Sequence, residues 1–375
     1  MAGNRRWLVL WFGLICVSVS AAAQPDDNAP IPGELPSTQT SDETRFSLAL
    51  TNETSLVSGA QVPLPAASNI ALLQPSFSYK HGQRWRFSST VIGEVSDNQQ
   101  ADSRLMVREA YAGLSTGDFD WTAGKRILRW GTGYAFSPTG VLDPPRIPTD
   151  PTDHLSLNEG RELASLDWTR GSSAVTAVWA SAGLLDKHAP GLYDTLALRY
   201  NVLYKGLDTA VIFDRDPVRP DLWGVNFTRV FGDGLEVHGE FARRRTGAAL
   251  VGINYTHSSG WGAIAEYYTA GAGPDWVPAG QDPALAPAVR RHYYFARIAK
   301  SRLRELPGWK EWDVFASVVG SFSDQSWAVV AEVDRRINHH VTAYGRALMP
   351  GGSPRSLFGA IPFDVFTSLG LKFQL

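Results

Sequence analysis

The sequence predicts an all-β protein, a single transmembrane antiparallel β-barrel of about eighteen strands, with sixteen as the alternative. Hydrophobic and polar residues alternate in short stretches from about residue 44 to residue 375, as successive residues of a strand do. After the first 23 residues no apolar stretch has the length of a transmembrane helix. A chain that crosses lipid with strands must close its sheet, because only closure satisfies every backbone group there.

The first residues have the pattern of a secretory signal. Arg5 and Arg6 precede the apolar stretch 7–20, and a small-residue cleavage site ends at Ala23. We expect a cleaved signal peptide at 1–23, because the stretch is short for the alternative, a single membrane anchor. Residues 24–43 are rich in Pro, Asp, Asn, Ser and Thr, which predicts a flexible periplasmic segment before a barrel at 44–375.

Composition excludes several functions. The 35 basic and 37 acidic residues give a net charge of −2, or −4 without Arg5 and Arg6, which is no footprint for nucleic acid. Cys16 is the one cysteine and lies in the predicted signal, so we expect no disulfide, thiol nucleophile or zinc–cysteine site.

The predicted strands are amphipathic and separated by turn-forming residues. In the strand 220–231, for example, Trp223, Val225 and Phe227 oppose Asn226 and Thr228. Tryptophans near strand ends are typical of the aromatic girdles of a membrane barrel. The eighteen strands are expected near 44–52, 74–79, 84–95, 104–114, 118–127, 161–169, 172–182, 194–204, 207–214, 220–231, 235–244, 248–257, 260–270, 290–300, 310–320, 327–337, 339–348 and 365–375.

The last strand, 365–375, has one face suited to lipid and ends in Phe373 and Leu375. Closing strands of bacterial outer-membrane barrels commonly have this pattern, so we expect the barrel-assembly machinery to bind through these two residues. The lengths of the links between strands also indicate an outer-membrane barrel, because such barrels alternate short periplasmic turns with long outer loops. Links after even-numbered strands are short except 301–309, whereas those after odd-numbered strands include 53–73, 96–103, 128–160, 183–193, 271–289 and 349–364.

Alternation also assigns charged residues to the lumen, because charges near the midplane of the lipid face cost a few kcal/mol each. The expected lining is balanced in sign, which indicates a wet interior without strong ion selectivity. Its main members are Arg84, Arg86, Arg108, Arg199, Glu236, Glu240, Glu266, Glu332, Asp334 and Arg336.

Motifs of enzymes are lacking. Neither G-x-S-x-G nor H-E-x-x-H occurs. Glu236, His238 and Glu240 share one strand face, where we favour a hydrogen-bond network over a general base. The spacing of Asp150, Asp153 and His154 does not match an EF-hand. We therefore expect no enzyme, no catalytic residue, no metal site and no cofactor.

The longest link, 128–160, carries the most information. Loops this long are usually functional or disordered, and its tryptophan, aromatic and leucine anchors and its five prolines argue against disorder. The glycines Gly131 and Gly133 are not a dinucleotide fingerprint, because Phe136 replaces the third glycine. We expect them to allow a sharp turn.

The pattern Trp130-Gly-x-Gly-x-x-Phe-x-Pro138, followed by a Pro/Asp-rich stretch and Glu159-Gly160-Arg161, resembles porin-type outer-membrane barrels of Gram-negative bacteria. In porins a comparable loop folds inward and narrows the channel. The resemblance therefore implies a pore constriction formed by Arg129, Asp143, Arg146, Asp150, Asp153, Glu159 and Arg161.

The expected function is passive diffusion of small hydrophilic solutes across the outer membrane. The expected surroundings are membrane lipid and lipopolysaccharide, and the sequence leaves monomer and homo-oligomer open. Two alternatives remain. One is a plugged barrel with an envelope-assembly, scaffolding or surface-interaction role, in which 128–160 is a plug, an outer cap or a recognition loop. The other is a barrel hydrolase.

Overall fold

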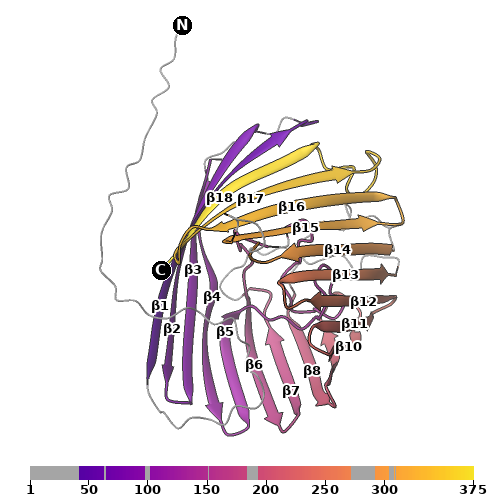
Figure 1. Cartoon of the computed structure of the whole chain (residues 1–375). Coiled ribbons are helices and arrows are strands. Elements are labelled where there is room, and N and C mark those ends of the chain that lie inside the picture. Colours follow the sequence, from indigo (N-terminus) through magenta and orange to yellow (C-terminus); the bar gives the residue numbers. More distant parts are fainter. Residues whose placement is uncertain are drawn as a thin grey trace. The chain divides into compact units, whose positions relative to one another are not determined.

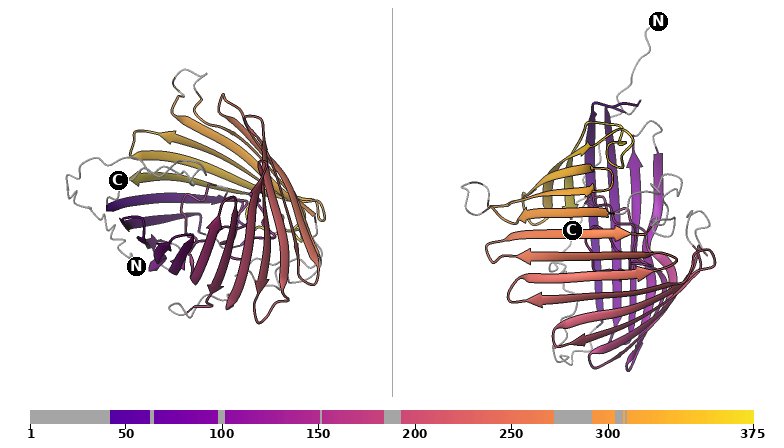
Figure 2. Two further views of the ribbon diagram at one scale, coloured as in Figure 1. Left: turned by 90° about the horizontal axis from the view of Figure 1, so that it is seen from below. Right: turned by 90° about the vertical axis from the view of Figure 1, so that its right-hand side faces the viewer.

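A computed structural model shows one closed antiparallel sheet of eighteen strands (Figures 1 and 2). It describes residues 42–62, 65–97, 102–150, 152–183, 193–271, 292–303, 308 and 310–375, which belong to one compact unit, Thr40–Leu375. The predicted signal peptide and nearly all of the predicted periplasmic segment lie outside these residues. Among the described residues, no helix is long and apolar enough to cross a membrane.

Each strand pairs with its neighbours in the chain, and the sheet closes where β1 pairs with β18, from Ala49 opposite Gln374 to Ser58 opposite Val365. The alternative of sixteen strands is thereby excluded. The strands are β1 (Glu43–Ser58), β2 (Ala67–His81), β3 (Trp85–Ser96), β4 (Asp102–Thr116), β5 (Phe119–Arg126), β6 (Arg161–Arg170), β7 (Ser173–Ala180), β8 (Thr195–Tyr204), β9 (Leu207–Arg215), β10 (Leu222–Phe231), β11 (Leu235–Arg243), β12 (Gly247–Thr256), β13 (Trp261–Ala270), β14 (His292–Lys300), β15 (Trp312–Ser321), β16 (Ser326–Arg336), β17 (Val341–Gly351) and β18 (Val365–Gln374).

The first two strands are longer than predicted, so the link between them is 59–66 and not 53–73. In β1 the outward positions include Asn52 and Thr54, and these polar residues hide the alternation. In β2 the inward residue Leu72 is buried against Leu155 of the long link, so both faces of the strand are apolar there.

The short links are hairpin turns. Between β8 and β9, Lys205 and Gly206 both have positive φ, 49° and 76°, which is the backbone of a type I′ turn. The exception expected from the sequence remains, since the link from β14 to β15 runs over 301–311.

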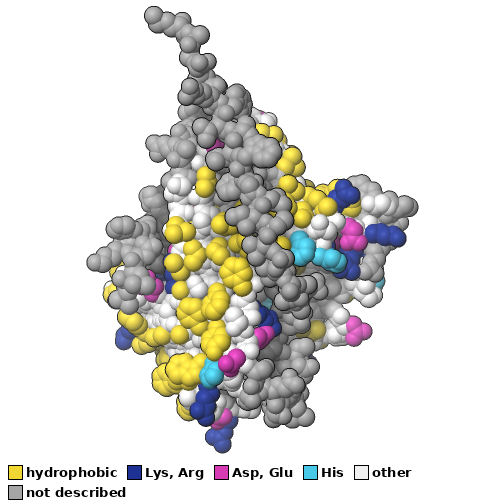
Figure 3. Space-filling model, turned by 90° about the vertical axis from the view of Figure 1, so that its left-hand side faces the viewer, with side chains coloured by type: hydrophobic (Ala, Val, Ile, Leu, Met, Phe, Trp, Pro, Cys, Tyr) yellow, Lys and Arg dark blue, Asp and Glu magenta, His cyan; other side chains and the backbone are white. Residues whose placement is uncertain are grey.

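The outer face of the barrel is apolar. Hydrophobic side chains gather along the middle of the face in Figure 3, and most of the charged side chains in view lie towards its margins, among them a group at the lower end. The predicted facing of β10 is confirmed, because Trp223 and Val225 are 61% and 37% exposed whereas Asn226 is 2% exposed. An apolar exterior around a charged interior is the arrangement that lipid requires of a transmembrane barrel.

Candidate functional site

The link from β5 to β6, residues 127–160, lies against the inner wall of the barrel and is called the inward segment below. It contacts three sectors of the wall through apolar side chains. Trp130 and Leu142 pack with residues of β6 to β11, Ala135 with residues of β13 to β16, and Leu155 and Leu157 with residues of β2 to β4. The segment is therefore a packed part of the lumen and not an outer cap.

Glu240 of β11 holds the first turn of the inward segment. Its carboxylate accepts hydrogen bonds from the backbone N–H groups of Thr132, Gly133 and Thr139 at 2.6, 2.7 and 2.8 Å, and from the hydroxyl of Thr139 at 2.7 Å. Glu240 is 3% exposed. A buried carboxylate needs such compensation, and hydrogen bonds to a charged acceptor are stronger than neutral ones.

The two glycines of this turn are needed for close packing. A Cβ at Gly131 would lie 1.5 Å from the Ser137 Oγ, and one at Gly133 would lie 2.0 Å from the Phe136 carbonyl oxygen. Neither glycine has a positive φ. The lack of room for a Cβ inside the turn, and not a left-handed backbone, explains the Gly-x-Gly pattern.

Two further wall residues extend this attachment. Glu266 of β13 accepts hydrogen bonds from the N–H groups of Tyr134 and Ala135, the latter at 2.8 Å, and lies 3.1 Å from the Nε2 of His238. Asn226 of β10 donates to the Trp130 carbonyl oxygen at 2.9 Å. Residues 130–139 are thus bound by side chains of three strands.

Asp143 and Arg146 form hydrogen bonds that join two parts of the inward segment. Asp143 accepts hydrogen bonds from the Trp130 N–H at 2.6 Å and from Arg146 at 3.0 Å, and Arg146 also donates to the carbonyls of Gly131 and Tyr134. Burial raises the pKa of Asp143, and the Trp130 N–H and Arg146 oppose that rise. These two charges therefore act inside the segment.

The second half of the inward segment pairs with β1, β16 and β17. Asp150 forms an ion pair with Arg346, which also lies 3.4 Å from the carboxylate of Glu53. Glu53 in turn accepts a hydrogen bond from the Tyr344 hydroxyl at 2.8 Å. Arg346 of β17 is therefore the basic residue of the wall that faces Asp150.

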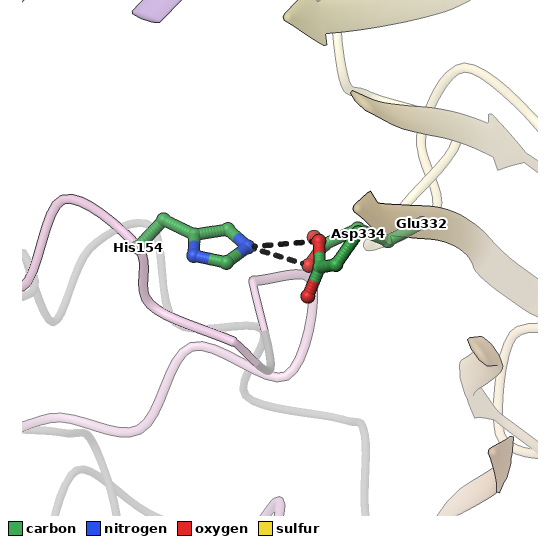
Figure 4. A group of neighbouring side chains, drawn as sticks. All are labelled: His154, Glu332 and Asp334. Carbon is green, nitrogen blue, oxygen red and sulfur yellow. Dashed lines mark hydrogen bonds and ion pairs between the residues drawn. The ribbon is translucent and has the colours of Figure 1, made fainter. Parts of the chain in front are cut away.

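His154 reaches two carboxylates of β16 (Figure 4). Its Nε2 lies 2.7 Å from Glu332 and 3.5 Å from Asp334, and Thr152 donates to the other oxygen of Glu332 at 2.9 Å. Burial alone would lower the pKa of His154, but the two carboxylates outweigh it and raise the pKa to about 9. In the absence of a competing ligand the imidazole is therefore charged at neutral pH.

The last part of the inward segment and the start of β6 are held by further hydrogen bonds and one ion pair. Asp153 caps a local turn by accepting from the Ser156 N–H at 3.1 Å and from Asn158 at 3.1 Å. Glu159 pairs with Lys125 of β5, and Arg161 donates to the Tyr193 carbonyl at 2.6 Å. At the exit, the Gly160 N–H donates to the carbonyl of Arg108, the extra residue of a bulge in β4.

The residues expected in the constriction thus differ in whether they have partners. Asp143, Arg146, Asp150, Asp153, Glu159 and Arg161 have partners within the segment or on nearby strands, whereas Arg129 is exposed. The residues expected to line the lumen differ in their exposure. Glu240, Glu266 and Glu332 are covered by the segment; Arg86, Arg108, Arg199, Glu236 and Asp334 are half-buried; Arg84 lies in the exposed turn before β3, and Arg336 is exposed at the end of β16.

Sequence reasoning missed two residues of the site. Glu53 was assigned to a loop, because the polar outer face of β1 concealed its strand. Arg346 lies in the middle of β17, on the same face as Tyr344. An arginine in the middle of a barrel strand belongs inside, so its position in the sequence could have identified it as a lumen residue.

Comparisons with known proteins agree on the fold. No family model matches the chain, and no curated protein matches its sequence. Among solved structures, it is similar to Pseudomonas aeruginosa OccK5 (OpdH), with a TM-score of 0.63 and 10% identity over 89% of this chain and 98% of that one. It is also similar to P. aeruginosa OccK3 (OpdO), with a TM-score of 0.62 and 12% identity over 89% and 96%. A mutant of Rh. blastica porin gives a TM-score of 0.51 and 11% identity over 89% and 100%.

Proposed function

We propose that the protein is an outer-membrane channel through which small hydrophilic solutes diffuse, and that the inward segment narrows it. The observation that carries this proposal is the attachment of the segment to the inner wall by backbone hydrogen bonds to Glu240 and Glu266. A chain held in this way fixes an opening of constant width. The charged wall around it keeps the remaining space wet.

The residues proposed at the constriction take two roles. Arg129 is exposed, and Glu159 and Arg161 are half-buried at the end of the segment, so these three charges are the ones we propose to meet a passing solute. Asp143, Arg146, Asp150 and Asp153 hold the shape of the segment through their hydrogen bonds and ion pairs. On the wall, Arg86, Arg108 and Arg199 are the proposed lining, and Glu240, Glu266 and Glu332 are anchors.

Solute entry into liposomes tests the proposed function. Liposomes that contain the folded protein should swell in a pentose or hexose solution faster than protein-free liposomes, and the rate should fall steeply for tri- and tetrasaccharides, because the inward segment limits the width. Protein boiled before reconstitution is the control. Swelling no faster than that of the control for any sugar would refute the channel.

One observation favours a plugged barrel as the second candidate. The apolar contacts of the inward segment reach β2 to β4, β6 to β11 and β13 to β16, which is most of the circumference. A plug would give no swelling with the intact protein and rapid swelling once the segment is shortened. The envelope-scaffolding role would then replace the channel.

We also propose that β18 is the strand bound by the barrel-assembly machinery. Phe373 and Leu375 are exposed on its outer face, next to Leu371. Replacing both Phe373 and Leu375 with serine should reduce the heat-modifiable barrel in the membrane fraction several-fold. Gln374→Ser, between them on the other face, is the matched control. Equal membrane levels of the double variant and the control would show that the signal lies elsewhere.

Lipid and lipopolysaccharide are the proposed neighbours of the apolar outer face of the barrel.

A further inference from the structure

Three metal-binding side chains meet where the inward segment crosses β16. His154 comes from the segment, and Glu332 and Asp334 come from alternate positions of the strand, so both carboxylates point to the same side (Figure 4). One ligand atom from each residue lies within 4.8 Å of the other two. The cluster is separate from the Glu240 attachment, which involves β11.

The surroundings fix two of these side chains in place. The His154 ring stacks on Tyr344 with the ring centroids 3.9 Å apart and the planes inclined by 18°. Thr152 donates to one oxygen of Glu332, which leaves the other oxygen directed at the imidazole. Metal sites use such outer partners to orient their ligands.

Asp334 supplies an independent indication of a ligand. Its Oδ1 is shielded from solvent, although the side chain as a whole is 24% exposed, and its one interaction in the described part of the chain is a long ion pair with the Nε2 of His154, 3.5 Å away. A shielded carboxylate oxygen without a close donor is costly. A cation placed among the three ligand atoms would satisfy it.

We propose that His154, Glu332 and Asp334 bind a divalent transition-metal ion of the zinc class, which ties the inward segment to β16. Zn²⁺ lies about 2.0–2.2 Å from nitrogen and oxygen ligands, so a tetrahedral site spaces its ligand atoms about 3.3–3.6 Å apart. The observed separations of 2.7 and 3.5 Å require small side-chain adjustments. Three protein ligands leave the fourth position to water.

Charge and ligand type favour this ion over the alternatives. Glu332 and Asp334 offer two anionic oxygen ligands beside the imidazole nitrogen of His154, a donor set that suits a divalent ion. Imidazole suits zinc-class ions, whereas Ca²⁺ and Mg²⁺ prefer all-oxygen shells of six or more ligands.

Zn²⁺ titration of the folded, chelator-treated protein in detergent tests the site, with calorimetry as the readout. We expect one ion per chain, and no binding of Mg²⁺ or Ca²⁺ at the same concentrations. His154→Gln and Asp334→Asn should each weaken Zn²⁺ binding by more than the about 10–100-fold that removal of an outer partner causes, and Thr152→Val should fall within that range. This readout does not depend on whether the barrel conducts solutes.

His81→Gln is the matched control, since His81 also faces a carboxylate, that of Asp42 at 2.8 Å, but on the exposed surface. Heat-modified migration on gels shows that each variant is folded. Wild-type affinity in both folded His154→Gln and folded Asp334→Asn would overturn the site, as would loss of binding in His81→Gln. Absence of Zn²⁺ binding to the wild-type protein would overturn it as well.

Discussion

Glu240→Ala is expected to release the first turn of the inward segment while leaving the barrel closed. The substitution deprives the N–H groups of Thr132, Gly133 and Thr139 of their shared acceptor. A buried donor without a partner costs about 1–3 kcal/mol, so retaining the present conformation would cost several kcal/mol. The turn should therefore leave the wall. Proteases should cleave within 127–160, and single-channel currents should become larger and noisier.

Glu236→Ala is the matched control for this experiment. Glu236 lies on the same strand and the same face, but it is half-exposed and its ion-pair partner is His238, at 3.4 Å. Its removal should leave protease resistance and current noise unchanged. Equal effects of the two substitutions, or a protease-resistant segment in Glu240→Ala, would show that Glu240 does not anchor the turn.

The fold was largely predictable because lipid outside and water inside impose a strict alternation. β10 shows this, with Trp223 and Val225 outside and Asn226 inside, as predicted. Alternation failed where another contact replaced lipid or water. Leu72 of β2 faces inward against Leu155, so its strand lost the polar face on which the prediction depended.

The site was less predictable, because its pairs join residues far apart in the chain. His154 and Glu332 are 178 positions apart, and Asp150 and Arg346 are 196 apart. Alternation places Glu332 on the inner face of its strand, where it is buried, but could not show what covers it there. The length of the 128–160 link and its Gly-x-Gly pattern identified the segment, whereas its partners depend on the path that the chain takes across the lumen.

The conductance of single channels in planar bilayers tests the central claim most directly, that the inward segment sets the width of a diffusion channel. The comparison is between the intact protein and a variant shortened between Ser137 and Asn158, in which the turn bound to Glu240 and Glu266 is largely kept. We expect a closed, heat-modifiable barrel for both and a conductance several-fold higher for the shortened one. Conductances that are equal would contradict the claim, since the segment would then lie outside the path of the solute.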